Sequence, residues 1–308
     1  MLELNYIRDL NLSTSAQIGR PTYLTAASGL VQVGEYLYIV GDDENHLAVF
    51  KANSNEVGTL IRLVEGDLPL DYEERKAAKG DFEVLLVLPS FDSYPYGALL
   101  ALGSGSKKTR RRGLLLELNA LGEVLGSPTT IDLTELYKSL KKQFSELNIE
   151  GAFIQQSTFN LVQRGNKSED SQNAIIQLDL NQVLESLATR QIIPSAAINH
   201  TMSYDIGAIE NVPLCFTDAV ALPTGDWVFS AAAEATDNAY ADGEYLGGAL
   251  GIVNARGTIT HLELIDRQYK VEGISAKLQE NRVELLLVTD ADNVAIPAKL
   301  LNTSFNMI

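Results

Sequence analysis

The sequence has few of the residues that mark several common classes of protein. It contains one cysteine, three histidines and one tryptophan in 308 residues. A single cysteine, Cys215, excludes an internal disulfide framework and a multi-cysteine metal cluster. His46, His200 and His261 lie far apart, without the spacing of a metal-binding pair, and none is placed as the base that a serine nucleophile needs. These scarcities argue against zinc-binding and serine-hydrolase classes.

Long apolar segments are also missing. No run of about 18 apolar residues is present, so we expect no membrane-spanning helix. Residues 1–12 contain Glu3, Arg8 and Asp9, where a signal peptide needs an apolar segment. We therefore expect a soluble protein without membrane insertion. It is expected to be cytoplasmic as the chain stands, or exported to the periplasm if a leader was removed.

Positive charge is scarce too. The chain has 24 basic residues against 40 acidic ones, and its formal net charge is −16. This charge opposes binding to nucleic acid or to an anionic membrane surface. It favours cations or a small-molecule ligand as partners, and no feature of the sequence identifies a protein partner.

What the sequence has is a fivefold repeat of short strands. Each round opens with a polar residue, continues through an apolar strand and a turn, and returns in a second strand that ends in polar residues. The openings are separated by 55, 67, 68 and 54 residues, and by 64 through the chain ends. Five similar intervals that together span the whole chain are typical of a radial β-propeller. We predict one all-β domain over residues 1–308, a five-bladed β-propeller, with a six-bladed propeller as the alternative. The openings are Ser28, Glu83, Glu150, Asp218 and Glu272.

The chain ends complete this prediction. Residues 2–12 alternate between apolar and polar and read as a strand without a nearby partner, while the last round has room for only three strands. The N-terminal strand is therefore expected to complete the last blade and close the ring. Helical spacing near residues 132–144 and 181–189 predicts two helices that decorate the outside.

The polar ends of the first two strands of every round are predicted to meet at one face of the ring, because consecutive strands run antiparallel. The predicted catalytic acids are Glu83, Glu150, Asp218 and Glu272. The predicted ligand-binding residues are Ser28, Ser104, Arg112, Arg164 and Glu234. The predicted metal ligands are Asp42, Glu150, Glu272 and Asp290.

Carboxylates around one narrow axis need a counter-charge or a hydrogen-bond donor. A bound Ca²⁺ or another divalent cation is one remedy. Inward-reaching bases, Arg164 and the basic run at residues 107–112, are another. In a third arrangement the acids accept backbone N–H bonds from neighbouring blades and serve the fold alone. In each of these arrangements we expect raised carboxylate pKa values at the axis.

The pairs Glu150-Gly151 and Glu272-Gly273 each follow an apolar residue. In this they resemble the strand-opening motif of the phytase-like and esterase-like β-propeller proteins, a broad bacterial group. The resemblance implies a propeller fold, acids that hold several Ca²⁺ ions, and bases that bind phosphate.

Three functions remain open at this point. The first is a small-molecule-binding propeller, perhaps a metal-dependent hydrolase of phosphate or carboxylic esters. The second is a non-catalytic binding or scaffold module that uses the same face. The third is a glycosidase that uses paired axial carboxylates, with Glu83, Glu150 and Asp218 as candidates.

Overall fold

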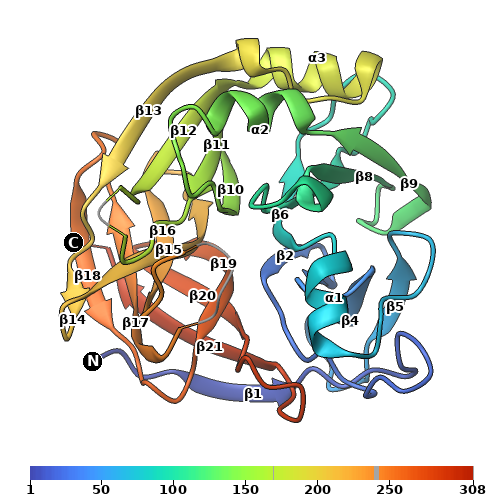
Figure 1. The fold of residues 1–308 in the computed structure, drawn as a ribbon, viewed down its shortest axis with the longest axis horizontal. Helices are drawn as coiled ribbons and strands as arrows, with labels where there is room; N and C mark the ends of the chain where they lie inside the picture. Colours follow the sequence, from blue (N-terminus) through green and yellow to red (C-terminus); the bar gives the residue numbers. More distant parts are fainter. Residues whose placement is uncertain (169, 239–242, 308) are drawn as a thin grey trace.

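The computed structural model describes residues 1–168, 170–238 and 243–307, which form five antiparallel sheets around a central axis (Figure 1). The innermost strand of each sheet packs against the innermost strands of the two neighbouring sheets, so the ring is closed. The predicted five-bladed propeller is confirmed, and the six-bladed alternative is wrong.

The blades follow one another along the chain, and each begins at the axis. Blade 1 consists of β2 (Gly29–Val33), β3 (Tyr36–Val40), β4 (His46–Lys51) and β5 (Thr59–Arg62). Blade 2 consists of β6 (Phe82–Leu88), β7 (Ala98–Gly103), β8 (Arg112–Leu118) and β9 (Val124–Asp132). Blade 3 consists of β10 (Ile149–Gln155), β11 (Thr158–Gln163), β12 (Asn173–Asp179) and β13 (Ile198–Tyr204). Blade 4 consists of β15 (Val212–Ala221), β16 (Trp227–Glu234), β17 (Tyr245–Val253) and β18 (Ile259–Leu264), with the short β14 (Ala208–Ile209) beside β15. Blade 5 consists of β19 (Val271–Gln279), β20 (Arg282–Thr289), β21 (Lys299–Asn306) and β1 (Asn5–Asp9).

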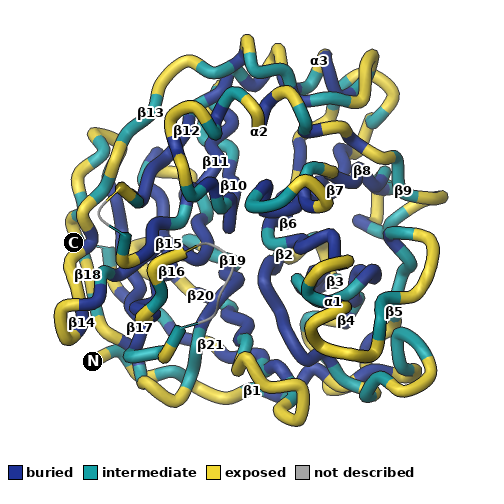
Figure 2. Tube along the Cα trace, viewed as in Figure 1, coloured by how far each residue is buried: buried dark blue, intermediate teal, exposed yellow. Residues whose placement is uncertain are grey.

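The outermost strand of each blade is its least buried strand (Figure 2). Every residue of β7 is buried, because this strand is covered on both faces by neighbouring blades. The outer strand β18 instead alternates between partly buried and exposed residues, since one face meets solvent. This difference is why apolar runs mark the middle strands and alternating patterns mark the outer ones.

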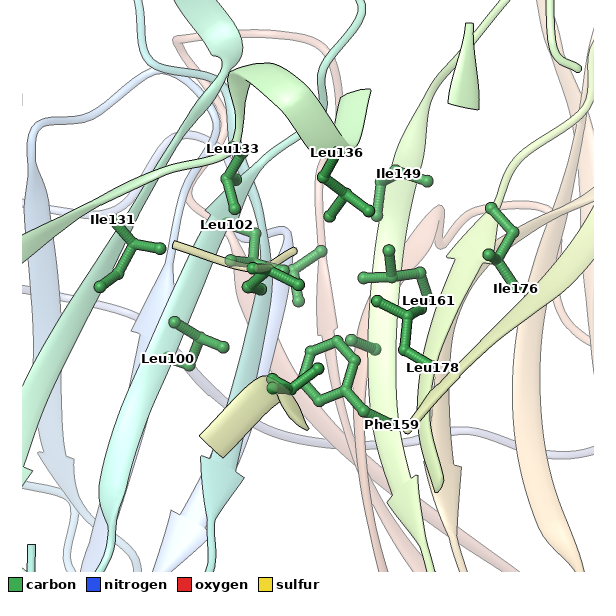
Figure 3. Close-up of a cluster of buried hydrophobic side chains, with 14 of the residues drawn as sticks. Leu100, Leu102, Ile131, Leu133, Leu136, Ile149, Phe159, Leu161, Ile176 and Leu178 are labelled. Carbon is green, nitrogen blue, oxygen red and sulfur yellow. The ribbon is translucent and has the colours of Figure 1, made fainter. Parts of the chain in front are cut away.

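Apolar side chains between adjacent blades form the core. Between blades 2 and 3, Leu100 and Leu102 lie in the same buried cluster as Leu161 and Ile176 (Figure 3). This face-to-face packing fixes the angle between blades, and so it fixes which strand ends meet at the axis.

In the described part of the chain, three α-helices and two short 3₁₀ helices join the strands. They are α1 (Tyr72–Ala78), α2 (Thr134–Leu140), α3 (Leu180–Arg190), η1 (Lys108–Arg110) and η2 (Ser195–Ala197). The expectation that α2 only decorates the outside is wrong, because Leu136, Tyr137 and Leu140 are buried in the cluster between blades 2 and 3. Among the described residues, no helix is both long and apolar enough to cross a membrane.

The predicted closing strand is confirmed. The strand β1 pairs antiparallel with β21, so the two ends of the described chain lie in one blade (Figure 1). Arg8 of β1 also donates hydrogen bonds from its guanidinium to backbone oxygens of blade 1, including that of Lys51 at 2.9 Å. The N-terminal strand therefore completes blade 5 and ties it to blade 1.

Candidate functional site

A β-bulge near the start of the innermost strand sets the direction of three acidic side chains. In β6 the extra, unpaired residue is Glu83 and in β10 it is Glu150, whereas in β19 the irregularity covers Glu272 and Gly273. A bulge re-aims its side chain relative to the regular pleat. All three carboxylates therefore line one cavity at the axis.

The predicted site residue Asp218 does not belong to this set. In β15 the bulge falls on Thr217, and Asp218 comes one residue later. A shift of one residue turns a side chain to the other face of the strand. The Asp218 carboxylate accepts hydrogen bonds from the backbone N–H groups of Ile274 at 2.9 Å and Ala219 at 2.7 Å. Asp218 thus ties blade 4 to blade 5, and it does not line the axial cavity.

Glycine after the bulge lets the inner strands come close. A Cβ on Gly151 would stand 2.6 Å from the Asp218 carboxylate, and a Cβ on Gly273 would stand 2.8 Å from the Ser28 carbonyl oxygen. The Glu-Gly pair therefore has two physical roles, one for the acid at the axis and one for the blade contact.

The ends of the second strands meet the bulges at the same face, as the antiparallel geometry predicts. Asp42, Arg164, Glu234 and Asp290 all line the axial cavity. The fifth such residue, Ser104, is buried beside the cavity, and its hydroxyl donates a hydrogen bond to Asp81.

Arg164 joins three blades through ion pairs. Its guanidinium lies 3.1 Å from Glu150, 2.9 Å from Glu234 and 4.0 Å from Glu272. The ammonium of Lys270 contacts two of the same acids, Glu234 at 2.6 Å and Glu272 at 3.2 Å. Two buried cations thus supply the counter-charge for three buried carboxylates.

A second group of charges lies on the other side of the cavity. Asp42, Asp81 and Glu83 each place a carboxylate oxygen within 4.8 Å of the other two, and we call these residues the acidic corner. The ammonium of Lys79 contacts Asp42 and lies 3.0 Å from Asp81. Arg110 lies 2.7 Å from Asp81 on its other side.

From the basic run at residues 107–112, the residue that reaches the cavity is therefore Arg110, in η1. The predicted ligand-binding residue Arg112 is exposed in β8 and does not line the cavity. Because side chains alternate along a strand, its neighbour Gly113 occupies the buried side. This correction leaves the prediction of an inward-reaching base right for Arg110 and Arg164.

The cavity itself is small and polar, with a volume of about 90 Å³, enough for several water molecules. Its described lining contains eight carboxylates and five bases, a formal excess of three negative charges. The lining carboxylates are Asp42, Asp81, Glu83, Glu150, Glu234, Glu272, Asp290 and Asp292. The lining bases are Lys76, Lys79, Arg110, Arg164 and Lys270, and the other named lining residues are Ser28, Asn148, Gly165, Asn166, Thr236 and Asn238.

Burial and crowding change the acidity of this lining. Desolvation raises the pKa of Glu150 to about 7, although the nearby Arg164 charge acts in the opposite direction. Desolvation, with the neighbouring charge of Glu150, also raises the pKa of Glu83 well above its usual range. Asp290 and Glu272 shift upward mainly through burial. Part of the formal negative charge is therefore neutralised by protons near neutral pH.

The four predicted metal ligands do not come together as one coordination group among the described residues. Glu150 and Glu272 face Arg164, whereas Asp42 belongs to the acidic corner with Asp81 and Glu83. That corner already holds the Lys79 ammonium against two of its three carboxylates. The donor set at the axis therefore fits protein cations better than one Ca²⁺ ion.

Sequence reasoning missed Lys79, Asp81, Lys270 and Asp292 as site residues. A signal for three of them was present, because Lys79, Asp81 and Glu83 lie two residues apart, as do Lys270 and Glu272. Charged residues that come shortly before an inner strand in the sequence thus line the cavity together with the acid on the bulge of that strand.

Known proteins share the fold of this chain at low sequence identity. An α-L-arabinofuranosidase from Podospora anserina, solved in complex with cellotriose, is 10% identical with a TM-score of 0.54, over 99% of this chain and 98% of that one. A luciferin-regenerating enzyme is 10% identical with a TM-score of 0.51, over 99% and 96%. The major allergen Mala s 1 of Malassezia sympodialis is 8% identical with a TM-score of 0.50, over 98% and 97%.

These likenesses establish the propeller fold and nothing finer. The resemblance to phytase-like and esterase-like propellers is confirmed as far as the fold, and the phytase-like assignment stays a prediction. No functionally curated protein sequence matches the chain. A family model does match, over residues 23–305, and the chain therefore belongs to the family described as a family of unknown function, DUF6929.

Proposed function

We propose that this propeller binds a small polar molecule in its axial cavity. The supporting observation is the charged lining itself, in which eight carboxylates and five bases from different blades face one cavity. Burying so many charges costs stability, and replacing a buried ion pair by apolar residues is often neutral or stabilising. A ligand that uses these groups accounts for keeping them.

The net negative charge of the cavity lining limits which charge the ligand can carry. Four of the five lining bases, Lys79, Arg110, Arg164 and Lys270, already contact carboxylates within 4.0 Å. A phosphate dianion would meet an excess of negative charge and few available cations. We therefore propose a neutral or cationic ligand, and a phosphate ester is disfavoured.

The test combines ligand screening with a blocked cavity. Thermal unfolding and crystal soaks with a library of small polar molecules should yield compounds that stabilise the protein and occupy the axis. Thr236→Trp at the cavity wall should abolish that stabilisation, whereas Ser304→Trp, outside the cavity, should keep it. Stabilising compounds that bind Thr236→Trp equally well would refute the proposal.

A hydrolase with acid–base chemistry is the second candidate. It is favoured by Glu150, whose pKa of about 7 suits a general acid at neutral pH. In this candidate Glu150 gives a proton to the leaving oxygen, and Glu83 is the second carboxyl group. One solved propeller of similar fold is an α-L-arabinofuranosidase. Aryl glycosides are the substrates to test, and turnover that survives Glu150→Gln would remove this candidate.

A divalent cation is the remaining candidate occupant of the acidic corner. We propose that Ca²⁺ competes there with the Lys79 ammonium, which contacts Asp42 and Asp81. Ca²⁺ should then raise the unfolding temperature of Lys79→Met more than that of the wild type. Equal Ca²⁺ responses of the two proteins would contradict a metal at this corner.

A further inference from the structure

The acidic corner has one carboxylate more than its protein cations can pair. Lys79 contacts Asp42 and Asp81, and Arg110 contacts Asp81. The side chain of Glu83 forms no hydrogen bond and no ion pair within 4.0 Å with any residue in the described part of the chain. Buried carboxylates normally find such partners. The Glu83 carboxyl group, which borders the cavity, is therefore open to a hydrogen-bond donor that enters there.

The Glu83 side chain is partly buried at the edge of the cavity. Its oxygen lies within 4.8 Å of oxygens from both Asp42 and Asp81. A donor that enters beside Glu83 thus meets three acceptors at once. A positively charged nitrogen with several N–H groups has the matching charge and donor count.

A less polar pocket adjoins this corner. It has a volume of about 60 Å³ and lies against α1 and the loop that follows β20. Ala26, Tyr72 and Val294 supply its apolar surface. It shares Asp42 and Lys79 with the axial cavity, so the two spaces are neighbours.

We propose that the acidic corner binds a cationic nitrogen of the ligand, and that the pocket against α1 receives the carbon skeleton attached to it. The ligand class is a primary amine with a short apolar or aromatic group. This inference rests on the proposed binding function of the axial cavity.

The first experiment compares three probes of equal shape on the wild-type protein. Benzylammonium, benzyl alcohol and benzoate differ mainly in the charge of one end. Calorimetric titration at low salt should show that benzylammonium binds at least about tenfold more tightly than the alcohol, because a hydrogen bond to a charged group is stronger than a neutral one. Benzoate should not bind. Equal binding of the alcohol and the ammonium would overturn the inference, without any need for a variant.

The second experiment tests whether the acidic corner is responsible for the tighter binding of benzylammonium. Glu83→Gln should weaken benzylammonium binding about 10- to 100-fold, the range for a lost charged hydrogen bond. Glu284→Gln, the same change at an exposed position, should leave it unchanged. Val294→Ser should weaken benzylammonium binding and leave methylammonium binding unchanged, since only the former fills the apolar pocket. Unchanged benzylammonium affinity in Glu83→Gln would contradict the assignment.

Crystal soaks distinguish a failure of the cation inference from a failure of the proposed binding function. If neutral or anionic compounds occupy the axial cavity and amines do not, the cation inference fails and the binding function stands. If no compound of any charge occupies the cavity, the proposed function itself fails.

Discussion

Replacing Glu150 by glutamine should change how the stability of the protein depends on pH. The pKa of Glu150 rises from 4.5 to about 7 on folding, chiefly because the carboxyl group is desolvated. The folded state therefore holds the Glu150 proton over a range in which the unfolded chain has lost it. Below pH 4.5 both states are protonated, and this contribution to stability is fully present. It is lost as the pH rises from about 4.5 to about 7.

The size of the effect follows from the shift. Each pKa unit corresponds to 1.36 kcal/mol, so the wild type should lose about 3 kcal/mol relative to Glu150→Gln across this range. The glutamine variant carries no proton to lose at this position. The ion pair with Arg164 adds no separate contribution, because it forms only as Glu150 ionises and already acts on the pKa of about 7.

Urea unfolding at half-unit steps from pH 4 to 8.5 measures the difference directly. The free energy of unfolding of wild type minus that of Glu150→Gln should fall by about 3 kcal/mol and then level off above pH 7. Glu284→Gln, the same change at an exposed position, controls for the effect of the substitution itself. A flat difference for Glu150→Gln would show that the burial of this carboxyl group does not perturb its ionisation.

Three further predictions concern the frame around the site. Arg164→Met should destabilise the protein by about 3–5 kcal/mol in chemical unfolding, because it leaves three buried carboxylates with less counter-charge. The control Arg112→Met, at an exposed position, should stay within about 0.5 kcal/mol of the wild type. Similar losses of stability in both variants would contradict the role of Arg164. Gly151→Ala should cost about 1–3 kcal/mol in the same assay, since the added Cβ would stand 2.6 Å from the Asp218 carboxylate, and an unchanged midpoint would show that blades 3 and 4 can separate freely. Removal of residues 1–9 exposes the edge of β21 and should lower the free energy of unfolding by about 1 kcal/mol for each hydrogen bond lost, and with it the unfolding temperature. A synthetic peptide of residues 1–12 should restore the unfolding temperature. No response to the peptide would count against strand closure.

The architecture could be predicted from the sequence because it depends on a repeated pattern. Five similar intervals and an unpaired first strand were enough to indicate five blades and their closure. The convergence of Asp42, Arg164, Glu234 and Asp290 also followed, since antiparallel strands bring these ends to one face.

The details of the site depended on features that the pattern does not carry. Aligning the acids placed Asp218 with Glu83 and Glu150, whereas the bulge falls on Thr217. The position of a bulge is set by pairing with the next strand, and neither acid spacing nor apolar periodicity reveals it. Partnerships such as that of Arg164 with Glu272 join segments far apart in the sequence, so they arise only when the blades have packed together.

The closing strand gives folding a fixed order of events. Among the described strands of the propeller, β1 is synthesised before all the others and its partner β21 after all the others. Until then β1 has no sheet to join, and blades 1 to 4 can assemble while the ring is still open. Arg164 contacts acids in blades 3, 4 and 5, so its network of ion pairs can be completed only once blade 5 is in place. The axial site is thus one of the last parts of the molecule to form, and ligand binding would report that the whole ring has closed.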